Sequence, residues 1–149
     1  MKFHKFLNVI LIVLVILILT ACVTTIKTDH IPEVTGKSQI IVIYFTASNC
    51  SHCIKWEENN KGFFASDESK FIAFHTIRRE YYEEPVNKAA LPDHLQWVLE
   101  QTKITYAPTF IVIVDRNILL QTYKWDKEVL PLIKELVSLK KVALKKANE

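Results

Sequence analysis

An apolar run that leads directly into a pair of cysteines constrains this chain more than any other feature. Residues 40–46 are almost all apolar and rich in β-branched side chains, which is the pattern of a strand buried on both faces. Cys50 and Cys53 follow shortly after this run, and a helical pattern extends from Cys50 to about Phe64. Two thiols at the junction of a strand and a helix can form a metal clamp, a structural disulfide or a redox dithiol.

The rest of the pattern predicts further strands and helices in alternation. After the first strand and helix, the expected elements are a strand at 71–77, a helix at 91–99, a strand at 109–114, a turn at 115–117 into a hairpin partner, and a helix from about 126 into the 140s. Pro131 is expected to delay the regular start of the last helix. The apolar face of that helix is formed by Val129, Ile133, Leu136, Val137 and Leu139.

This order predicts a mixed sheet. The first two strands need a parallel crossover, while the last pair forms an antiparallel hairpin, so helices should cover both faces of the sheet. The expected fold class is therefore α/β, with four strands and three helices. No repeat or low-complexity segment interrupts the pattern, which indicates one domain.

The N-terminus has the pattern of a secretory signal. Lys2 and Lys5 precede an uninterrupted apolar stretch of eleven residues, 9–19, which is the length of a signal-peptide core and short of a membrane-spanning helix. The following Leu-Thr-Ala-Cys, ending at Cys22, resembles the bacterial lipobox, in which the cysteine becomes a lipid-modified N-terminus. An uncleaved signal anchor with an incidental cysteine is the alternative.

The lipobox resemblance predicts the domain organisation and the compartment. Residues 1–21 would be a lipoprotein signal peptide, 22–37 a polar tether and 38–149 the folded domain. The protein would be anchored to a membrane through Cys22 and would face the periplasm or the cell exterior. Its 128 residues from Cys22 onward suffice for one domain with a hydrophobic core.

The charge balance gives no indication of a nucleic-acid partner. Without Lys2 and Lys5 the chain has 17 basic and 16 acidic residues, whereas nucleic-acid binding needs a concentrated basic face. Four of the lysines lie in the C-terminal tail at 140–146, where cations suit the negative end of a helix dipole. We therefore expect no nucleic-acid partner. Separately, we expect the protein to be a monomer.

Two separate segments together resemble the thioredoxin-like family. One is the strand that runs into Cys50-Ser51-His52-Cys53, and the other is Ala107-Pro108-Thr109 at the start of a hairpin strand. The resemblance covers about residues 38–141 and implies a thioredoxin fold and a CxxC thiol–disulfide oxidoreductase. Within that family, the anchor at Cys22 resembles the membrane-tethered bacterial members.

The position of the pair at a helix start favours thiolate chemistry. The unpaired N–H groups and the positive dipole end of the helix stabilise the Cys50 thiolate, and Cys53 lies on the same side, within reach of Cys50. The family resemblance implies that Cys50 is the nucleophile, that Cys53 resolves the mixed disulfide and that Pro108 is cis. It also implies that the segment around Pro108, with Ala107 and Thr109, contacts the substrate. No cofactor is expected, and the partners would be protein thiols or disulfides and a redox partner protein.

Metal binding is the alternative use of the pair. Zinc usually needs four ligands, and the chain has no second cysteine pair, while His75 and His94 lie at no recognisable spacing from the first. A copper-binding or metallochaperone module that uses Cys50, Cys53 and a histidine remains the alternative function. We predict that no residue is a resident metal ligand.

The direction of electron flow stays open between reductase and oxidase, with a slight preference for reductase. His52 could stabilise the Cys50 thiolate, which would make a stronger oxidant, whereas small lipid-anchored members of the family are often reductases. The chain also departs from the family pattern, because Tyr44 stands at the position of a buried acid and Asn49 at the position of a tryptophan. An insert at 78–94 has no counterpart in the minimal fold and is either a surface loop or part of the active-site rim.

Overall fold

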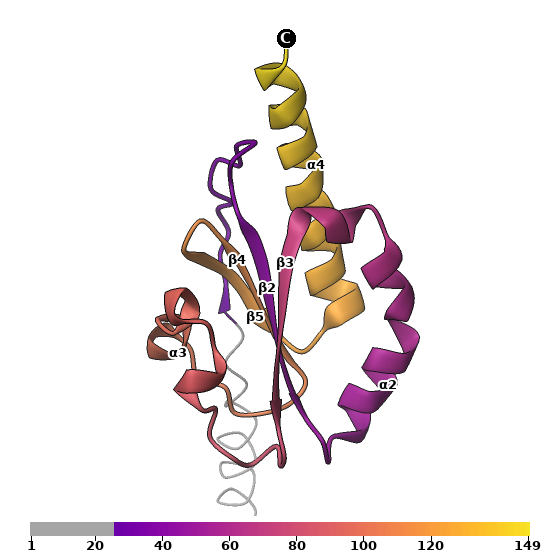
Figure 1. The fold of residues 1–149 in the computed structure, drawn as a ribbon, viewed down its shortest axis with the longest axis vertical. Helices are drawn as coiled ribbons and strands as arrows, with labels where there is room; N and C mark the ends of the chain where they lie inside the picture. Colours follow the sequence, from indigo (N-terminus) through magenta and orange to yellow (C-terminus); the bar gives the residue numbers. More distant parts are fainter. Residues whose placement is uncertain (1–25) are drawn as a thin grey trace, which may run out of the picture.

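A central five-stranded sheet organises residues 26–149, the part of the chain that the computed structural model describes. The signal peptide and Cys22, predicted from the sequence, lie outside the described residues. The strands are, in chain order, β1 (Ile26–Lys27), β2 (Ile40–Ala47), β3 (Ile72–Arg79), β4 (Thr109–Val114) and β5 (Asn117–Thr122), and they lie side by side in the order β1-β5-β4-β2-β3 (Figure 1).

The predicted mixed sheet is confirmed. β2 pairs in parallel with β3 over eight residues and antiparallel with β4, and the β4–β5 hairpin is antiparallel. The apolar run is the centre of the sheet, and every residue of β2 is buried, as its lack of alternation indicates. The hairpin turns at Asp115 and Arg116, which both have positive φ values, 45° and 68°, as a two-residue turn of this hand requires.

The sheet has five strands rather than the four expected, because β1 adds to its edge. Ile26 and Lys27 pair antiparallel with Gln121 and Leu120 of β5. Ile31 and Val34, farther along the segment expected as a tether, pack against the main hydrophobic cluster. The sequence did not predict this strand because the segment is polar, and the strand is held by backbone hydrogen bonds rather than by an apolar pattern.

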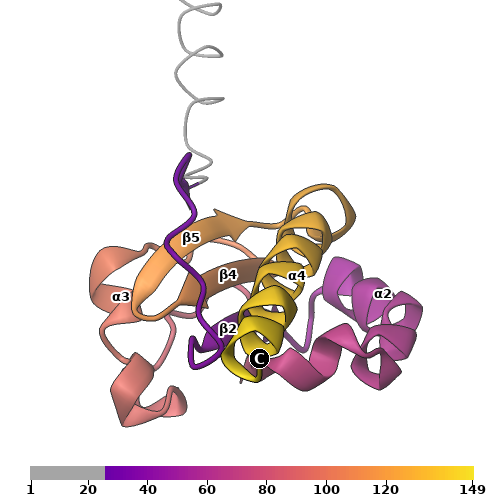
Figure 2. The same cartoon turned by 90° about the horizontal axis from the view of Figure 1, so that it is seen from above.

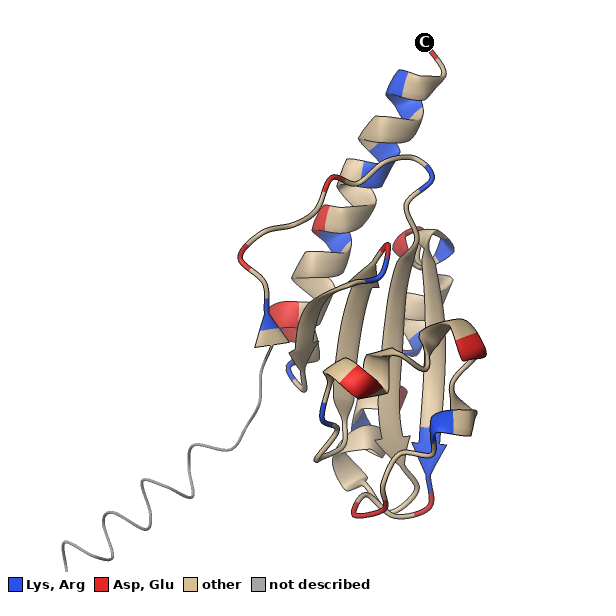
Figure 3. Ribbon diagram, turned by 90° about the vertical axis from the view of Figure 1, so that its left-hand side faces the viewer, with Lys and Arg blue, Asp and Glu red and all other residues tan. Residues whose placement is uncertain are grey.

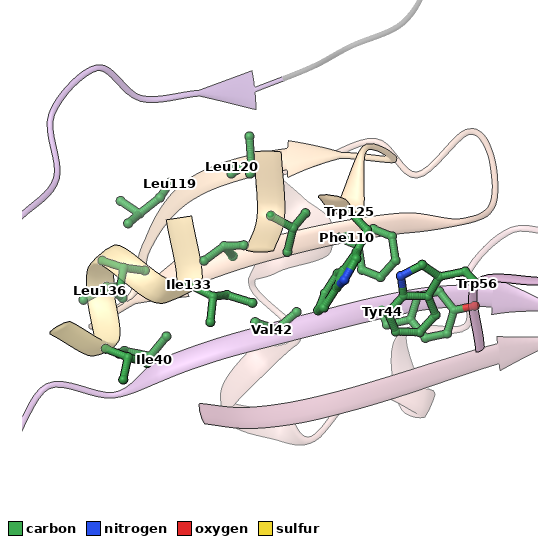
Figure 4. Packing of buried hydrophobic residues seen from close by; sticks show 14 of the residues in the cluster. Ile40, Val42, Tyr44, Trp56, Phe110, Leu119, Leu120, Trp125, Ile133 and Leu136 are labelled. Atoms are coloured by element: carbon green, nitrogen blue, oxygen red, sulfur yellow. The ribbon is translucent and has the colours of Figure 1, made fainter. Parts of the chain in front are cut away.

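Helices cover both faces of the sheet, as predicted. α2 (Ser51–Asn59) and α4 (Leu130–Ala147) lie on one face, and the short α3 (Val98–Gln101) lies on the other (Figure 2). The first face carries the larger cluster, in which Tyr44, Trp56, Phe110 and Trp125 meet (Figure 4). On the opposite face, the other side chains of β2 pack against the region around α3. The β2 residues are Ile41, Ile43 and Phe45, and those of the α3 region are mainly Leu91, Leu95 and Val98.

The two helices after β2 and β3 are shorter than their patterns predict. α2 ends at Asn59 because the backbone N–H and the side-chain amide of Asn60 both bond to the carbonyl of Trp56, and a 3₁₀ helix at Lys61–Ala65 follows. In the segment predicted as a helix at 91–99, a 3₁₀ turn at Asp93–Leu95 precedes the four-residue α3. Among residues 26–149, no helix is both long enough and apolar enough to span a bilayer.

The last helix begins as Pro131 predicts. A π-helical turn at Trp125–Val129 comes first, and α4 then starts at Leu130 with the proline in its first turn, where a missing N–H costs no hydrogen bond. Four residues of the predicted apolar face are buried: Val129, Ile133, Leu136 and Val137. The assignment of Leu139 to that face was wrong, because its side chain is 42% exposed, beyond the edge of the sheet-facing stripe.

Candidate functional site: a disulfide at the start of helix α2

The two cysteines of the CxxC motif form a disulfide at the junction between β2 and α2. Cys50 and Cys53 are bonded to each other, with their Cα atoms 5.2 Å apart. Cys50 is the N-cap of α2, and its sulfur accepts a hydrogen bond from the backbone N–H of Cys53 at 3.1 Å. A reduced Cys50 in this position would have its thiolate stabilised by the same N–H and by the helix dipole.

Burial distinguishes the two sulfur-bearing residues. Cys53 is fully buried, whereas Cys50 is 6% exposed. The first helical turn therefore leaves a small part of Cys50 accessible and places Cys53 behind it. An attacking group from solvent or from a partner reaches Cys50 first.

The segment around Pro108 lies against Cys50, although 57 residues separate the two in sequence. The Ala107–Pro108 peptide bond is cis, as the family resemblance implies, and the carbonyl oxygen of Ala107 is 3.4 Å from the Cys50 sulfur. Thr109 is buried and its hydroxyl donates to the carbonyl of Tyr106 at 2.8 Å, which holds the loop at the start of β4. A disulfide at the start of a helix thus lies against a cis-proline loop at one end of a mixed sheet. The chain has a thioredoxin-like fold.

Solved structures with this thioredoxin-like fold are similar to the chain at low identity. They include the periplasmic thioredoxin SoxS from Paracoccus pantotrophus in its reduced form, with 16% identity and a TM-score of 0.46, over 68% of this chain and 98% of that one. The germline-specific thioredoxin Deadhead from Drosophila melanogaster has 17% identity and a TM-score of 0.44, over 67% and 82% of the two chains. The DsbH oxidoreductase has 18% identity and a TM-score of 0.42, over 69% and 73%. No family model and no curated protein sequence matches the chain.

A hollow of about 730 Å³ lies beside the dithiol. His52, from the CxxC motif, and Ala107 and Pro108, from the cis-proline loop, line one part of it. The remaining lining comes from α2, from the loop before Pro108 and from the segment between β5 and α4: Trp56, Tyr106, Tyr123, Lys124, Trp125, Asp126 and Lys127. The structure therefore brings four of the sequence-predicted site residues, Cys50, His52, Ala107 and Pro108, to one edge of the sheet.

A polar network that the sequence analysis missed lies behind the dithiol. The hydroxyl of Tyr44, which stands where the family has an acid, donates to the carboxylate of Glu57 at 3.1 Å and lies 3.5 Å from the carbonyl oxygen of Cys53. Thr46 also donates to Glu57, at 3.2 Å, and Arg78 bonds to both carboxylate oxygens at 2.8 and 3.0 Å.

The carboxylate that Tyr44 connects to the region of the buried cysteine thus comes from α2 and not from β2. Two spacings in the sequence point to this network. Glu57 follows Cys53 by one helical turn, and Tyr44 and Thr46 are two residues apart and so share one face of β2. Burial is the main cause that raises the pKa of Tyr44 far above its usual value, and the negative charge of Glu57 adds to it. The phenol therefore remains a neutral hydrogen-bond donor at physiological pH.

The histidines weighed as metal ligands lie away from the dithiol. His75 pairs with Ile43 of β2, and Ile43 precedes Cys50 by seven residues in the chain. The ring centroid of His75 is 6.4 Å from that of His94. Burial, and then the neighbouring His94, lowers the pKa of His75. Within residues 26–149, no three His, Cys, Asp or Glu side chains are placed to hold a metal ion together.

The beginning of the insert at 78–94 borders the CxxC motif. The backbone N–H of Tyr82 donates to the side chain of Asn49, next to Cys50, at 3.1 Å, and the N–H of Ser48 donates to the carbonyl of Arg79. The buried guanidinium of Arg79 in turn donates to the carbonyl of Glu84, which ties the loop to the end of β3. Of the two interpretations of the insert, the structure supports a position on the rim of the site.

Proposed function

We propose that this protein is a thiol–disulfide oxidoreductase of the cell envelope. The observation that carries the proposal is the Cys50–Cys53 disulfide at the N-terminus of α2, with Cys50 slightly exposed, Cys53 fully buried and a cis-proline loop alongside. A structural role explains this disulfide poorly, because cross-linking residues only three apart removes little entropy from the unfolded chain.

The difference in burial between the two cysteines assigns the first step of the reaction to Cys50 and the second to Cys53. In the reduced protein, the Cys50 thiolate attacks a disulfide sulfur of the partner, a mixed disulfide forms and one partner thiolate leaves. Cys53 then loses its proton and attacks the Cys50 sulfur, which restores the Cys50–Cys53 disulfide and releases the second partner thiolate. Two electrons pass to the partner, whose two thiolates take up protons. The reverse sequence oxidises a partner dithiol.

The substrate segment binds along the cis-proline loop in this proposal. The backbone of Ala107 would pair with an extended partner segment, and the hollow lined by His52 and Tyr123 would accept the side chains next to the partner's cysteine. Thr109 supports the loop from below, since its hydroxyl is already bonded to the carbonyl of Tyr106.

Cys22 anchors the domain to a membrane in this proposal, and residues 1–21 are a lipoprotein signal peptide that is removed. A Cys22→Ala variant should lose fatty acid and remain unprocessed, because the chain has no other cysteine near the apolar stretch. Metabolic labelling with a fatty acid provides the test, and label retained by the variant would contradict the anchor.

We propose the reducing direction. A glutathione titration of the detergent-solubilised protein measures the relevant quantity. A midpoint near the roughly −270 mV of thioredoxin supports a reductase, whereas one near the roughly −120 mV of DsbA contradicts the direction and leaves the dithiol chemistry intact.

The activity itself is tested by reduction of a protein disulfide such as insulin. The native protein should catalyse the reaction, and Cys50→Ser should abolish it while retaining the fold. The copper alternative predicts a different result: tight one-to-one copper on the reduced protein, resistant to modest chelation, without disulfide reduction. That combination would overturn the proposed function.

A further inference from the structure

The first described strand fixes where the chain enters the domain. Ile26 of β1 pairs with Gln121, one residue before the end of β5, and Lys27 pairs with Leu120. The backbone N–H of Thr28 extends this pairing with a bond of 2.9 Å to the carbonyl of Leu119. The chain therefore joins the sheet at one defined end of β5 and runs away from that end.

That end of the sheet is the end that carries the dithiol. β2 and β5 are both antiparallel to β4, so these two strands run in the same direction. Their C-terminal ends therefore lie at the same end of the sheet. At this end of the sheet the chain leaves β2 to form the CxxC motif. At the same end it leaves β5 and reaches Tyr123, which lines the same hollow as His52. Figure 1 shows the C-terminus at the opposite end of the molecule, beyond α4.

The distance between Cys22 and Ile26 is limited by the number of residues. Four residues span about 14 Å at most when fully extended. α4 has 18 residues and is therefore about 27 Å long, and it runs from the dithiol end toward the C-terminus. A lipid on Cys22 consequently holds the dithiol end nearer to the bilayer than the C-terminal end.

From this arrangement we propose that β1 orients the dithiol toward the membrane, and that the partner is a membrane protein whose cysteines lie at the outer surface of the bilayer. The proposal rests on the proposed function and on the anchor at Cys22. The short reach concentrates Cys50 in the layer next to the membrane, where such a protein presents its thiols. A soluble disulfide gains nothing from this concentration.

The side chains around the dithiol suit such a partner. Tyr81, Tyr82 and Tyr123, which flank the site in the insert and after β5, are 50%, 45% and 46% exposed. Tyrosine is enriched both at protein interfaces and at membrane–water interfaces. Lys124 and Lys127 line the hollow beside the dithiol, and a separate group of lysines lies in the last turns of α4, at the other end of the molecule (Figure 3).

The test compares two disulfide probes on vesicles that carry the lipidated protein. One probe is a transmembrane peptide with a dye-quenching disulfide a few residues outside the bilayer, and the other is the same dye pair on soluble glutathione disulfide. One variant has 12 Gly/Ser residues inserted before Ile26, and the matched control has the same insert between Pro32 and Glu33, after β1. In a second variant, residues 1–22 are deleted and a C-terminal histidine tag attaches the protein to nickel-chelating lipid.

The insert before Ile26 lengthens the linker from 4 to 16 residues and should slow the reaction with the surface probe about eightfold, because effective concentration falls with the −3/2 power of linker length. The control insert should leave this rate unchanged as long as the Thr28 amide stays protected from hydrogen exchange. C-terminal attachment should slow the surface reaction at least as much. All variants should react with the soluble probe at the native rate.

An unchanged surface rate with the insert before Ile26, or an equal surface rate with C-terminal attachment, would overturn the proposal. A soluble-probe rate that falls when the native protein is placed on plain lipid vesicles would also overturn it, because the dithiol would then be covered by lipid. Loss of reaction with both probes in every variant would instead contradict the proposed oxidoreductase function.

Discussion

At the scale of single residues, Tyr44 replaces an expected acid with a buried phenol. Its ring stacks on Phe110 with centroids 5.0 Å apart and contacts Trp56 at 4.5 Å, while its hydroxyl reaches Glu57. A neutral phenol costs less to bury than a carboxylate does, and it still connects the dithiol region to a charge. The carboxylate itself stays where solvent and Arg78 can stabilise it, with 33% of its side chain exposed.

Burial of Tyr44 predicts a loss of stability at high pH. Its pKa is raised in the folded state, so the folded protein keeps a proton that the unfolded chain releases above about pH 10. This contribution is fully present below pH 10 and falls by up to about 1.4 kcal/mol per pH unit above it. Urea unfolding at pH 9 to 11.5 should show a steeper decline for the native protein than for Tyr44→Phe. Parallel declines would show that Tyr44 ionises freely in the fold.

Glu57 is the carboxylate best placed to influence deprotonation of Cys53. A Glu57→Gln change keeps the size of the side chain and one acceptor oxygen for Tyr44 and Thr46. It removes the charge, the proton acceptor and the second oxygen to which Arg78 donates. We expect release of a Cys50 mixed disulfide to slow roughly tenfold near neutral pH, less than the ~10²-fold of a fully positioned acid–base group, because water reaches Glu57.

Stopped-flow release of a dye thiol from the Cys50 mixed disulfide, followed as a function of pH, measures this effect. Glu58→Gln, one position along the same helix, is the control and should leave the profile unchanged. A Glu57→Gln profile that superimposes on the native one would show that the network is only structural.

At the scale of elements, α4 holds the sheet face behind the dithiol through a narrow stripe. Ile133 and Leu136 are fully buried against the sheet, as Figure 4 shows, and Leu139 is exposed only three residues farther on. The helix therefore contacts the sheet with its first half and extends beyond it with its second.

Two leucines of α4 provide a matched test of this packing. Leu136→Ala should reduce the free energy of unfolding by about 2–5 kcal/mol, because it removes a fully buried side chain and leaves a cavity. Leu139→Ala should change it by less than about 0.5 kcal/mol. Chemical denaturation of the oxidised proteins measures both values, and equal losses would contradict the position of the stripe.

The accuracy of the sequence predictions at this scale followed the length and regularity of each pattern. The expected strand 40–46 became β2 and 109–114 became β4, because long apolar runs have few alternatives to the middle of a sheet. The helix expected at 91–99 was shortened to 3₁₀ turns and α3, since its leucines can be buried without a regular helix. β1 has only two residues, and no periodicity could have revealed it.

For the site, the sequence located the motifs but not the network between them. The CxxC motif and the Pro108 segment are short and specific, so their residues were found, and the structure places them together. Glu57 was missed because its role depends on a contact with Tyr44, 13 residues away, and glutamates on a helix surface are ordinary.

At the scale of the whole molecule, the two ends have different chemistry. The dithiol, the exposed tyrosines and the entry of β1 share one end, and the lysine-rich end of α4 forms the other. Gly36 packs against Leu144 near that second end, where an added Cβ would lie 2.8 Å from the leucine side chain. The segment between β1 and β2 therefore follows the length of the domain.

Because the dithiol end and the lysine-rich end lie at opposite ends of the molecule, we predict that the terminal lysines do not assist membrane attachment. Each lysine at an anionic surface contributes about 1 kcal/mol, so if Lys145 and Lys146 faced the bilayer, replacing both with glutamine would speed transfer of the lipidated protein between vesicles about 30-fold. We expect no change beyond about twofold. A large acceleration, measured by energy transfer between labelled vesicles, would place the wrong end at the membrane.

The central claim is that Cys50 is the nucleophile and Cys53 the resolving thiol, and trapping of mixed disulfides tests it most directly. Cys53→Ala should accumulate partners bound through Cys50, because the thiol that would release them is gone, whereas Cys50→Ala should accumulate few, since Cys53 is fully buried. Non-reducing gels of membranes from cells that express each variant provide the measurement. Equal trapping by the two variants would contradict the account.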